Sequence, residues 1–263
     1  MPVDSLSVTF AGGARSVTGS QFLVEATRNG LTTRILIDCG LQQGTRPCES
    51  GNSDAFSFDP KSLDAVFFTH AHADHIGLFP KLVKEGFHGS AYATPPTAEL
   101  MPLMLEDAVS LITREAKECG KEAPYAKEDV LSATARLVPL PYKKSISITE
   151  GISVTLYNAG HILGSATVLL DAHGTRLLFT GDLGRDPSIL LPEAEIPEGP
   201  IDYLFTESVY GSRVHEEVTV SEKVLQRELA RVTKEKGTLL IPSFSLERTQ
   251  IILAALDRMV SEK

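Results

Sequence analysis

Short runs of β-branched and aromatic residues alternate along the chain with turn residues, a pattern typical of β-strands. Seven such runs are bounded by Gly, Asp or Asn. Turn signals separate the first three runs from one another, and likewise the last three, so each group predicts an antiparallel meander. The predicted strands are Leu6–Phe10, Gln21–Glu25, Thr33–Ile37, Ala65–Thr69, Ser153–Tyr157, Ala166–Leu170 and Arg176–Thr180.

Helical periodicity of the apolar residues appears mainly between the two groups of strands. There the pattern predicts helices over His75–Glu85, Pro102–Glu118 and Lys127–Arg136. Two successive blocks that each combine strands with helices favour an α/β (α+β) fold. In this fold two sheets pack face to face with helices outside, which is a four-layer αββα sandwich.

After residue 200, strands and helices alternate one by one. A capping box opens the first helix of this region and a glycine ends it. The alternation predicts the start of a parallel α/β unit. We therefore divide the chain into one domain over residues 1–206 and the beginning of a second, incomplete domain over residues 207–263. The elements predicted after residue 200 are the strands Tyr203–Thr206 and Thr238–Phe244, a helix capped by Thr219 and Glu222 and ended by Gly237, and a helix over Leu246–Val260.

The composition is that of an ordinary globular protein, with 42% hydrophobic and 22% charged residues among 263. No apolar run approaches the roughly 18 residues that a membrane span needs, and the N-terminal residues lack the pattern of a secretory signal. We therefore expect a cytoplasmic protein without a membrane segment. The net charge of −9 argues against a surface that attracts nucleic acid throughout, but it allows a local basic cleft.

The three cysteines, Cys39, Cys48 and Cys119, are widely spaced, and no CxxC motif occurs. This arrangement predicts neither a disulfide framework nor a thiolate zinc site. Any metal ion in this protein would therefore be held by histidine and carboxylate ligands.

The sequence THAHADH, residues 69–75, follows directly after a predicted strand. It places three imidazoles and one carboxylate within six residues, which would be costly as packing and suits a pair of divalent cations. The alanines between them are small, so the loop can coil tightly. We expect His70 and His72 to point at one cation, and Asp74 and His75 at a second.

Two further strand ends carry matching ligands. His161 follows Asn158-Ala159-Gly160, and Asp182 follows Gly181. Glycine lets the backbone turn close to a metal ion. A carboxylate can bridge two cations about 3.5–4 Å apart, and such a pair lowers the pKa of bound water toward about 7. Asp182 is therefore the predicted bridge, and water the predicted nucleophile in a chain without a GxSxG motif.

These residues resemble the successive metal-binding motifs of the metallo-β-lactamase fold, and Asp38 resembles its first motif, a structural aspartate near the site. Further segments resemble the β-CASP ribonucleases, relatives of the cleavage and polyadenylation endonuclease. The resemblance covers nearly the whole chain. Its segments are GARSVTGS at residues 13–20, ESVYGSR at residues 207–213, in which Glu207 matches the acidic motif A, and LLIPSFSLERTQ at residues 239–250.

The resemblance implies a two-zinc phosphodiesterase that cleaves single-stranded RNA in RNA processing, with Asp74 and Glu207 as catalytic residues. It is compatible with a homodimer. In the family, two later histidines serve as general acid and as a ligand of the second metal, and Glu207 would orient the acid. Neither histidine can be assigned here, because only His215 follows Asp182 in this sequence. The second zinc site is therefore expected to be the weaker one. The implied metal ligands are His70, His72, Asp74, His75, His161 and Asp182.

Two other functions stay open. A hydrolase of small esters or thioesters on the same fold fits the shortness and acidity of the chain, but the segments around Glu207 and Ile241–Gln250 speak against it. A non-catalytic RNA-processing subunit is the second alternative. Retention of the metal-ligand set argues against that function.

Overall fold

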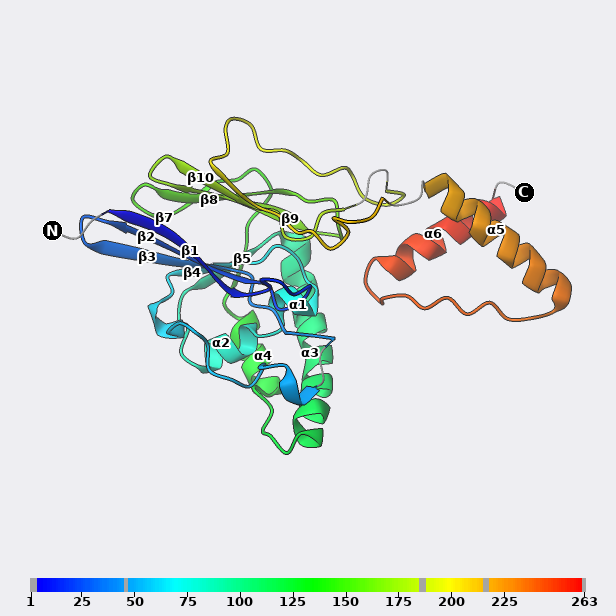
Figure 1. The fold of residues 1–263 in the computed structure, drawn as a ribbon, viewed down its shortest axis with the longest axis horizontal. Helices are drawn as coiled ribbons and strands as arrows, with labels where there is room; N and C mark the ends of the chain where they lie inside the picture. Colours follow the sequence, from blue (N-terminus) through cyan, green and yellow to red (C-terminus); the bar gives the residue numbers. More distant parts are fainter. Residues whose placement is uncertain (1–3, 45–46, 185–187, 215–217, 262–263) are drawn as a thin grey trace.

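The computed structural model describes residues 4–44, 47–184, 188–214 and 218–261. It contains two β-sheets that pack against each other, and helices cover the outer face of the first sheet (Figure 1). In the first sheet, strands β1 to β3 form the predicted antiparallel meander, and β3 to β6 run parallel. Its strands, in spatial order, are β1 (Ser5–Gly12), β2 (Gln21–Arg28), β3 (Leu31–Ile37), β4 (Ala65–Phe67), β5 (Ser90–Ala93) and β6 (Leu137–Pro139).

The second sheet has the order β11-β10-β9-β8-β7. Its first four strands in the chain form an antiparallel meander, and β11 adds to β10 in parallel. All eight strands predicted before residue 207 are confirmed. The sequence analysis does not predict β5, β6 and β7, which have three or four residues each. The strands of this sheet are β7 (Ile146–Thr149), β8 (Ile152–Asn158), β9 (Ala166–Ala172), β10 (Thr175–Phe179) and β11 (Tyr203–Phe205).

The helices differ from the predicted ones mainly at their starts. The helix predicted over residues 75–85 is divided in two, because Pro80 has no N–H to donate and is tolerated only near the start of a helix. The helix predicted from Pro102 begins at Pro95, where the Thr94 hydroxyl accepts the Thr97 N–H as a cap. None of the described helices combines the length and apolar character that a bilayer crossing requires. The helices are η1 (Pro47–Glu49), η2 (Pro60–Ser62), α1 (Ala73–Ile76), α2 (Phe79–Lys84), α3 (Pro95–Glu118), α4 (Lys127–Thr134), α5 (Val218–Glu235) and α6 (Arg248–Ser261).

Apolar side chains form two buried clusters, one on each face of the first sheet. Phe68 belongs to the cluster beneath helices α1 to α4, and Phe67 to the cluster between the two sheets. Neighbouring side chains point to opposite faces of an extended chain, so the segment that leads to His70 is buried from both sides. Each fully buried phenylalanine stabilises the fold by about 1.5–3 kcal/mol.

A loop covers the outer face of the second sheet (Figure 1). The Asn158 amide donates to the Glu193 carbonyl at 2.9 Å, and the Arg176 guanidinium donates to the Pro200 carbonyl at 2.8 Å. The two packed sheets with helices on the first confirm the predicted fold class. The predicted four-layer sandwich also has helices on the outer face of the second sheet. Among the described residues, this loop covers that face instead.

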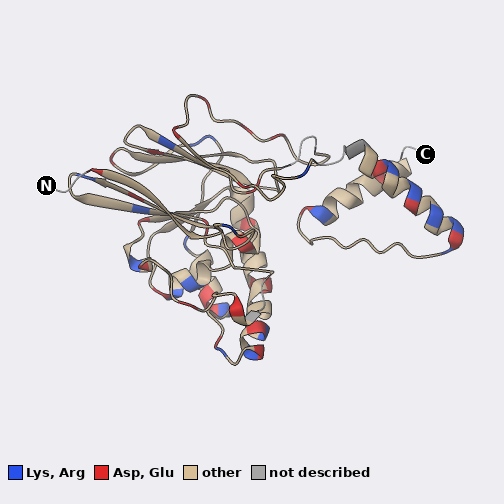
Figure 2. Ribbon diagram, in the orientation of Figure 1, with Lys and Arg blue, Asp and Glu red and all other residues tan. Residues whose placement is uncertain are grey.

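The last two helices, α5 and α6, lie beside the sandwich, away from α1 to α4 (Figure 1). Helix α5 carries charges of both signs along its length (Figure 2). The prediction of a strand over Thr238–Phe244 is wrong, because this segment is extended without forming a ladder. A strand needs a neighbour to pair its backbone groups, and the described residues provide none here. Helix α5 begins at Val218, so Thr219 lies inside the helix rather than at its cap.

A disulfide joins Cys48 and Cys119, so the prediction from cysteine spacing is wrong. The two residues are 71 positions apart in the sequence, but η1 lies next to the end of α3 and brings their Cα atoms to 5.3 Å. Spacing along the chain could not reveal this approach. The third cysteine, Cys39, is a buried free thiol, and burial raises its pKa well above the ordinary value.

Candidate metal centre

The first histidines of the candidate site lie in the turn between β4 and α1. Strand β4 is wholly buried in the interior of the first sheet, and the His70 side chain beyond its end is 0% exposed. The carbonyl of His72 accepts the backbone N–H groups of His75 and Ile76, at 2.9 and 3.0 Å, which starts helix α1. The end of a rigid strand and the start of a helix therefore fix the turn from both sides.

Two loops of the second sheet approach this turn. His161 follows β8, and Asp182 follows β10. The Gly184 N–H donates to the Ala159 carbonyl at 2.9 Å, so the two loops touch backbone to backbone. A Cβ atom at Gly184 would lie 1.7 Å from the Gly160 carbonyl oxygen, and only glycine permits this approach.

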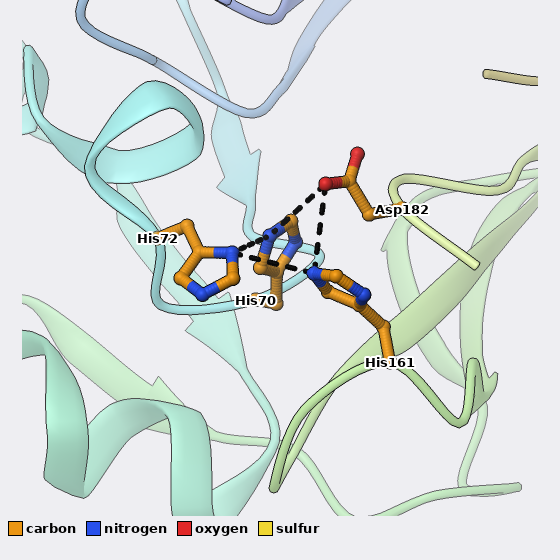
Figure 3. A group of neighbouring side chains, drawn as sticks. All are labelled: His70, His72, His161 and Asp182. Carbon is orange, nitrogen blue, oxygen red and sulfur yellow. Dashed lines mark hydrogen bonds and ion pairs between the residues drawn. The ribbon is translucent and has the colours of Figure 1, made fainter. Parts of the chain in front are cut away.

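Four of the predicted site residues form one compact group (Figure 3). His72 Nδ1 lies 3.0 Å from His70 Nε2 and 3.3 Å from His161 Nε2. Asp182 Oδ2 lies 3.5 Å from His161 Nε2 and 3.8 Å from His70 Nε2. One ligand atom from each residue therefore falls within 4.8 Å of all the others.

Asp74 and His75 lie on the other side of Asp182. His75 Nε2 is 3.3 Å from Asp182 Oδ1 and 4.0 Å from Asp74 Oδ2. The two oxygens of Asp182 thus face different groups: one faces His70 and His161, and the other faces His75. This is the placement that a bridging carboxylate requires.

The charge states of the group formed by His70, His72, His161 and Asp182 suit a metal ion. Burial lowers the pKa of His72 and of His161 to about 4, with the neighbouring imidazole of His75 adding to the effect. Burial lowers the pKa of His70 as well, helped by the other imidazoles. All three rings are therefore neutral at neutral pH and offer nitrogen lone pairs, which metal binding requires. Neutral imidazoles beside a carboxylate fit zinc and similar cations.

The carboxylates respond to the same surroundings. Burial raises the pKa of Asp74 above its ordinary value, despite the opposing charge of His75. Burial would also raise the pKa of Asp182, but the hydrogen bond from His75 and the nearby imidazoles lower it overall. Asp182 is thus held as a carboxylate, which suits a ligand shared by two groups.

Asp38 supports the site from behind. Its carboxylate accepts the backbone N–H of Thr69 at 2.8 Å and lies 2.7 Å from His75 Nδ1. Burial alone would lower the pKa of His75, but Asp38 and Asp182 raise it well above the ordinary value. The contact with Asp38 leaves the other ring nitrogen, Nε2, facing Asp74 and Asp182. A carboxylate that orients a ligating histidine through its second nitrogen is a common feature of metal sites.

Glu207 follows β11 and reaches the turn that contains Asp182. Its carboxylate accepts the backbone N–H of Leu183 at 3.0 Å and that of Val209 at 3.3 Å. Its negative charge opposes the fall in the pKa of His161. The structure therefore brings Glu207 next to the four-residue group, where it fixes the residue that follows Asp182.

Sequence reasoning missed two hydroxyl groups that hold ligand residues in place. The Thr69 hydroxyl donates to Asp38 at 2.9 Å and lies 3.0 Å from His70 Nδ1. The Ser165 hydroxyl accepts the His161 N–H at 2.9 Å. Only their proximity in sequence to His70 and His161 could have indicated them.

The remaining histidines lie elsewhere. His88 offers its carbonyl to Arg136 at 2.7 Å, and His173 occupies a turn with its ring 3.0 Å from Arg28. Neither contact involves a residue of the candidate metal centre. His215 lies outside the described residues.

The fold and the site together define the class of this protein. It is a mixed α/β protein that gathers imidazoles and carboxylates at the ends of strands from two packed sheets, in an arrangement suited to divalent metal ions. The family model of the metallo-beta-lactamase superfamily matches residues 17–243. The chain therefore belongs to the metallo-β-lactamase superfamily, whose members bind divalent metal ions.

Curated relatives agree with this assignment. A ribonuclease of Thermus thermophilus is 38% identical over 93% of this chain and 53% of its own length. The transcription termination factor FttA of Methanocaldococcus jannaschii is 36% identical over 96% of this chain and 39% of its own. Subunit 3 of the cleavage and polyadenylation specificity factor of Dictyostelium discoideum is 31% identical over 97% of this chain and 32% of its own.

These relatives are of the β-CASP type that the sequence motifs resemble. This chain spans about half the length of the Thermus ribonuclease and less of the other two. A solved structure of a protein of unknown function from Enterococcus faecalis has a TM-score of 0.50 and 20% identity, over 88% of this chain and 57% of that one. That likeness concerns the fold alone.

Proposed function

We propose that this chain carries the metal centre of a two-zinc phosphodiesterase that cleaves RNA in RNA processing. The observation that carries the proposal is the convergence of His70, His72, His161 and Asp182 from three strand ends, with one ligand atom of each within 4.8 Å of the others. The names of the relatives, a ribonuclease and a polyadenylation-factor subunit among them, support RNA as the substrate.

The ligand sets follow from the two groups around Asp182. His70, His72, His161 and Asp182 would hold the first zinc ion. Asp74, His75 and Asp182 would hold the second. The first set contains three neutral imidazoles, whereas the second contains one imidazole and two carboxylates. We expect the second ion to bind more weakly, because the later histidine ligand of the family has no counterpart in this chain.

The metal ions, when bound, would supply a water of lowered pKa and positive charge that stabilises the phosphoryl oxygens. The chain supplies the rest. Asp74 is mostly buried beside His75, and a carboxylate there can orient the attacking water and accept its proton. Asp182 separates the two ligand groups and keeps them at a fixed spacing.

Glu207 is the second proposed catalytic residue. In the β-CASP ribonucleases that the sequence resembles, the matching residue orients a general acid. That acid is a histidine with no match among the 263 residues of this chain. The contacts of Glu207 with the N–H groups of Leu183 and Val209 hold its carboxylate at the edge of the site, beside the turn that carries Asp182. We therefore assign Glu207 to the side of the site where the leaving oxygen is protonated.

The proposed substrate is single-stranded RNA. A cytoplasmic location and a homodimer stay predictions.

The experiment that tests the function uses labelled RNA and a panel of thioesters. It compares the 263-residue chain with a chimaera that adds the C-terminal part of the Thermus thermophilus ribonuclease after Lys263. We expect metal-dependent, salt-sensitive RNA cleavage by the chimaera, because contacts with phosphates release counterions.

The shorter chain should cleave RNA poorly, because the general acid and much of the phosphate-binding surface are missing from it. Vigorous thioester hydrolysis by the shorter chain, without RNA cleavage by the chimaera, would contradict the nuclease proposal and favour a small-substrate hydrolase. Metal binding without either activity would favour a non-catalytic RNA-processing subunit. Elemental analysis should find close to two zinc ions per chain, or closer to one if the second ion is lost in purification.

A further inference from the structure

The disulfide between Cys48 and Cys119 lies outside the metal centre, and the proposed function does not use it. It joins η1 to the C-terminal end of α3. Cys48 is exposed, so a thiol in solution can reach the bond. Exposed disulfides are reduced more easily than buried ones, and the labile ones are often regulatory. The contacts of the residues near Cys48 decide whether reduction of this bond would affect the metal centre.

Asn52, four positions after Cys48, connects this region to an earlier segment of the chain. Its side chain is 9% exposed and lies against the backbone of Gln42. Asn52 Oδ1 accepts the Gln42 N–H at 2.9 Å, and Asn52 Nδ2 donates to the Gln42 carbonyl at 3.0 Å. An amide that both donates to one residue and accepts from it fixes the position and the orientation of that residue.

The residues just before Gln42 lie along helix α1, which carries two residues of the metal centre. The Leu41 N–H donates to the Ala73 carbonyl at 3.0 Å, and the Cys39 N–H donates to the His75 carbonyl at 2.7 Å. Helix α1 has only four residues, and so short a helix is not stable alone. These contacts from outside therefore help to fix the ligand side chains that α1 carries.

A second connection runs through the loop between β1 and β2. The Thr18 hydroxyl accepts the Gln43 N–H at 2.8 Å and lies 2.9 Å from the Gln43 carbonyl. This loop ends at Ser20, whose N–H donates to the Asp74 carbonyl at 2.9 Å. A displacement of Gln42 and Gln43 would therefore reach α1 by two routes.

Packing between this segment and α3 is incomplete. A cavity of about 200 Å³ lies between residues 41–44 and α3, with Asn52 and Glu115 in its lining. Side chains that line a cavity lack the van der Waals contacts that packed neighbours would make. The disulfide thus supplies a covalent link to α3 where packing is incomplete.

We propose that the disulfide between Cys48 and Cys119 is a redox-sensitive clamp on the metal centre. With the bond intact, η1 stays against α3, and the hydrogen bonds of Asn52 hold the segment that supports α1. With the bond reduced, η1 is free to leave α3, and α1 holds Asp74 and His75 less firmly. This inference rests on the proposed function, because it takes Asp74 and His75 to be metal ligands.

The reductant that this clamp requires is a dithiol, such as a protein with a CxxC pair. One thiolate of the dithiol attacks the exposed Cys48 Sγ, the S–S bond breaks, and Cys119 leaves as a thiolate that takes up a proton. The second thiol then displaces Cys48 and closes a disulfide in the reductant. Two electrons and two protons thus pass from the dithiol to this chain, and exchange with an oxidised disulfide reverses the step.

The test compares cobalt(II) binding by the oxidised and the reduced full chain, in competition with a chelator. Dithiothreitol reduces the protein, and gel filtration under nitrogen then removes the reagent, because thiolates bind metal ions. A variant that combines Cys48→Ser with Cys119→Ser has no clamp. It also lacks the two thiols that could bind cobalt themselves.

Two further variants separate the clamp from a general loss of stability. Asn52→Ala removes the link to Gln42 and leaves the disulfide in place. Val154→Ala removes buried methyl groups from the second sheet and lowers the stability without touching this route. Circular dichroism checks that each variant folds. Should Asn52→Ala fail to fold, Asn52→Asp replaces it, because a carboxylate cannot donate to the Gln42 carbonyl.

We expect reduction to weaken cobalt binding about fivefold, near the lower end of the usual couplings between distant groups. The larger change should fall on the ion held by Asp74, His75 and Asp182. Oxidised glutathione should restore the affinity. The double serine variant should match the reduced chain and respond to neither reagent. Asn52→Ala should bind cobalt more weakly with no further change on reduction, and Val154→Ala should keep the affinity of the unaltered chain.

Equal affinities of the oxidised and reduced chain for every cobalt ion bound would overturn the clamp and leave the metal centre in place. A response of Asn52→Ala to reduction as large as that of the unaltered chain would overturn it too, because the route runs through Asn52. A loss of affinity in Val154→Ala equal to that on reduction would assign the effect to general destabilisation. Failure of the oxidised chain to bind cobalt would instead contradict the proposed function itself.

Discussion

The sandwich and the C-terminal segment, residues 4–206 and 207–261, differ in what their apolar side chains contact. In the sandwich, apolar residues of both sheets fill two buried clusters. In the C-terminal segment, Leu240, Phe244 and Val260 are 85%, 80% and 73% exposed. Among the described apolar residues of that segment, Ala255 alone is buried.

The difference teaches that an apolar β-branched run is not sufficient for a strand. The run Ala65–Phe67 becomes β4 because β3 and β5 flank it and pair its backbone groups. The run Thr238–Phe244 has an equally apolar sequence and lies as an extended loop, with no described strand beside it. Strand formation is a property of the sheet, and the sequence of one run cannot supply the neighbours.

The largest expected effect tests whether the sandwich holds the metal. Replacing His70 and His72 together by alanine removes half of the first ligand group, so the purified protein should lose nearly all bound zinc. Elemental analysis after gel filtration measures this loss. Leu240→Ala in the C-terminal segment is the control and should keep its metal. Zinc retained by the double variant would show that the metal is held elsewhere.

The next effect tests the contrast in burial. Phe67→Ala removes a fully buried side chain between the two sheets and should lower the free energy of unfolding by about 3–5 kcal/mol. Phe244→Ala removes an exposed side chain and should change it by less than about 0.5 kcal/mol. Urea denaturation followed by circular dichroism compares the two. Equal losses would mean that Phe244 is covered in solution, and the contrast between the regions would fail.

Asp74→Asn tests whether a residue of the sandwich takes part in catalysis. The amide keeps the shape of the side chain but removes the charge, so RNA cleavage by the chimaera should fall by a factor on the order of 10² or more. The melting temperature should change little. Asp107→Asn on the exposed face of α3 controls for a change in surface charge alone. Unaltered turnover in Asp74→Asn would contradict its proposed role in orienting water.

The smallest expected effect concerns the covalent link within the sandwich. Cys48→Ser removes the disulfide to Cys119 and should lower the free energy of unfolding by about 2 kcal/mol, near the low end for disulfides, because Cys48 is exposed and packing also holds its segment. Reductant should destabilise the unaltered chain by a similar amount and leave the variant unchanged. Detection of three free thiols in the non-reduced protein would contradict the link.

Much of the sandwich could be predicted from the sequence because its signals are local. Alternation gives the long strands, and the THAHADH turn, Gly160-His161 and Gly181-Asp182 all follow strands that the pattern reveals. The chemistry of each ligand is likewise a property of its side chain. The sequence by itself therefore predicted the class of site and the four residues that the structure brings together, His70, His72, His161 and Asp182.

Only the tertiary structure decided the features that depend on contacts between segments distant in the sequence. Packing brings Cys48 to Cys119, and it sets Leu246 against the buried cluster beneath helices α1 to α4, although neither contact has a local signal in the sequence. It also divides the oxygens of Asp182 between two ligand groups. The physical reason is that periodicity and turn preferences act over a few residues, whereas burial, pairing of backbone groups and the shared pKa shifts of the histidines depend on neighbours distant in sequence.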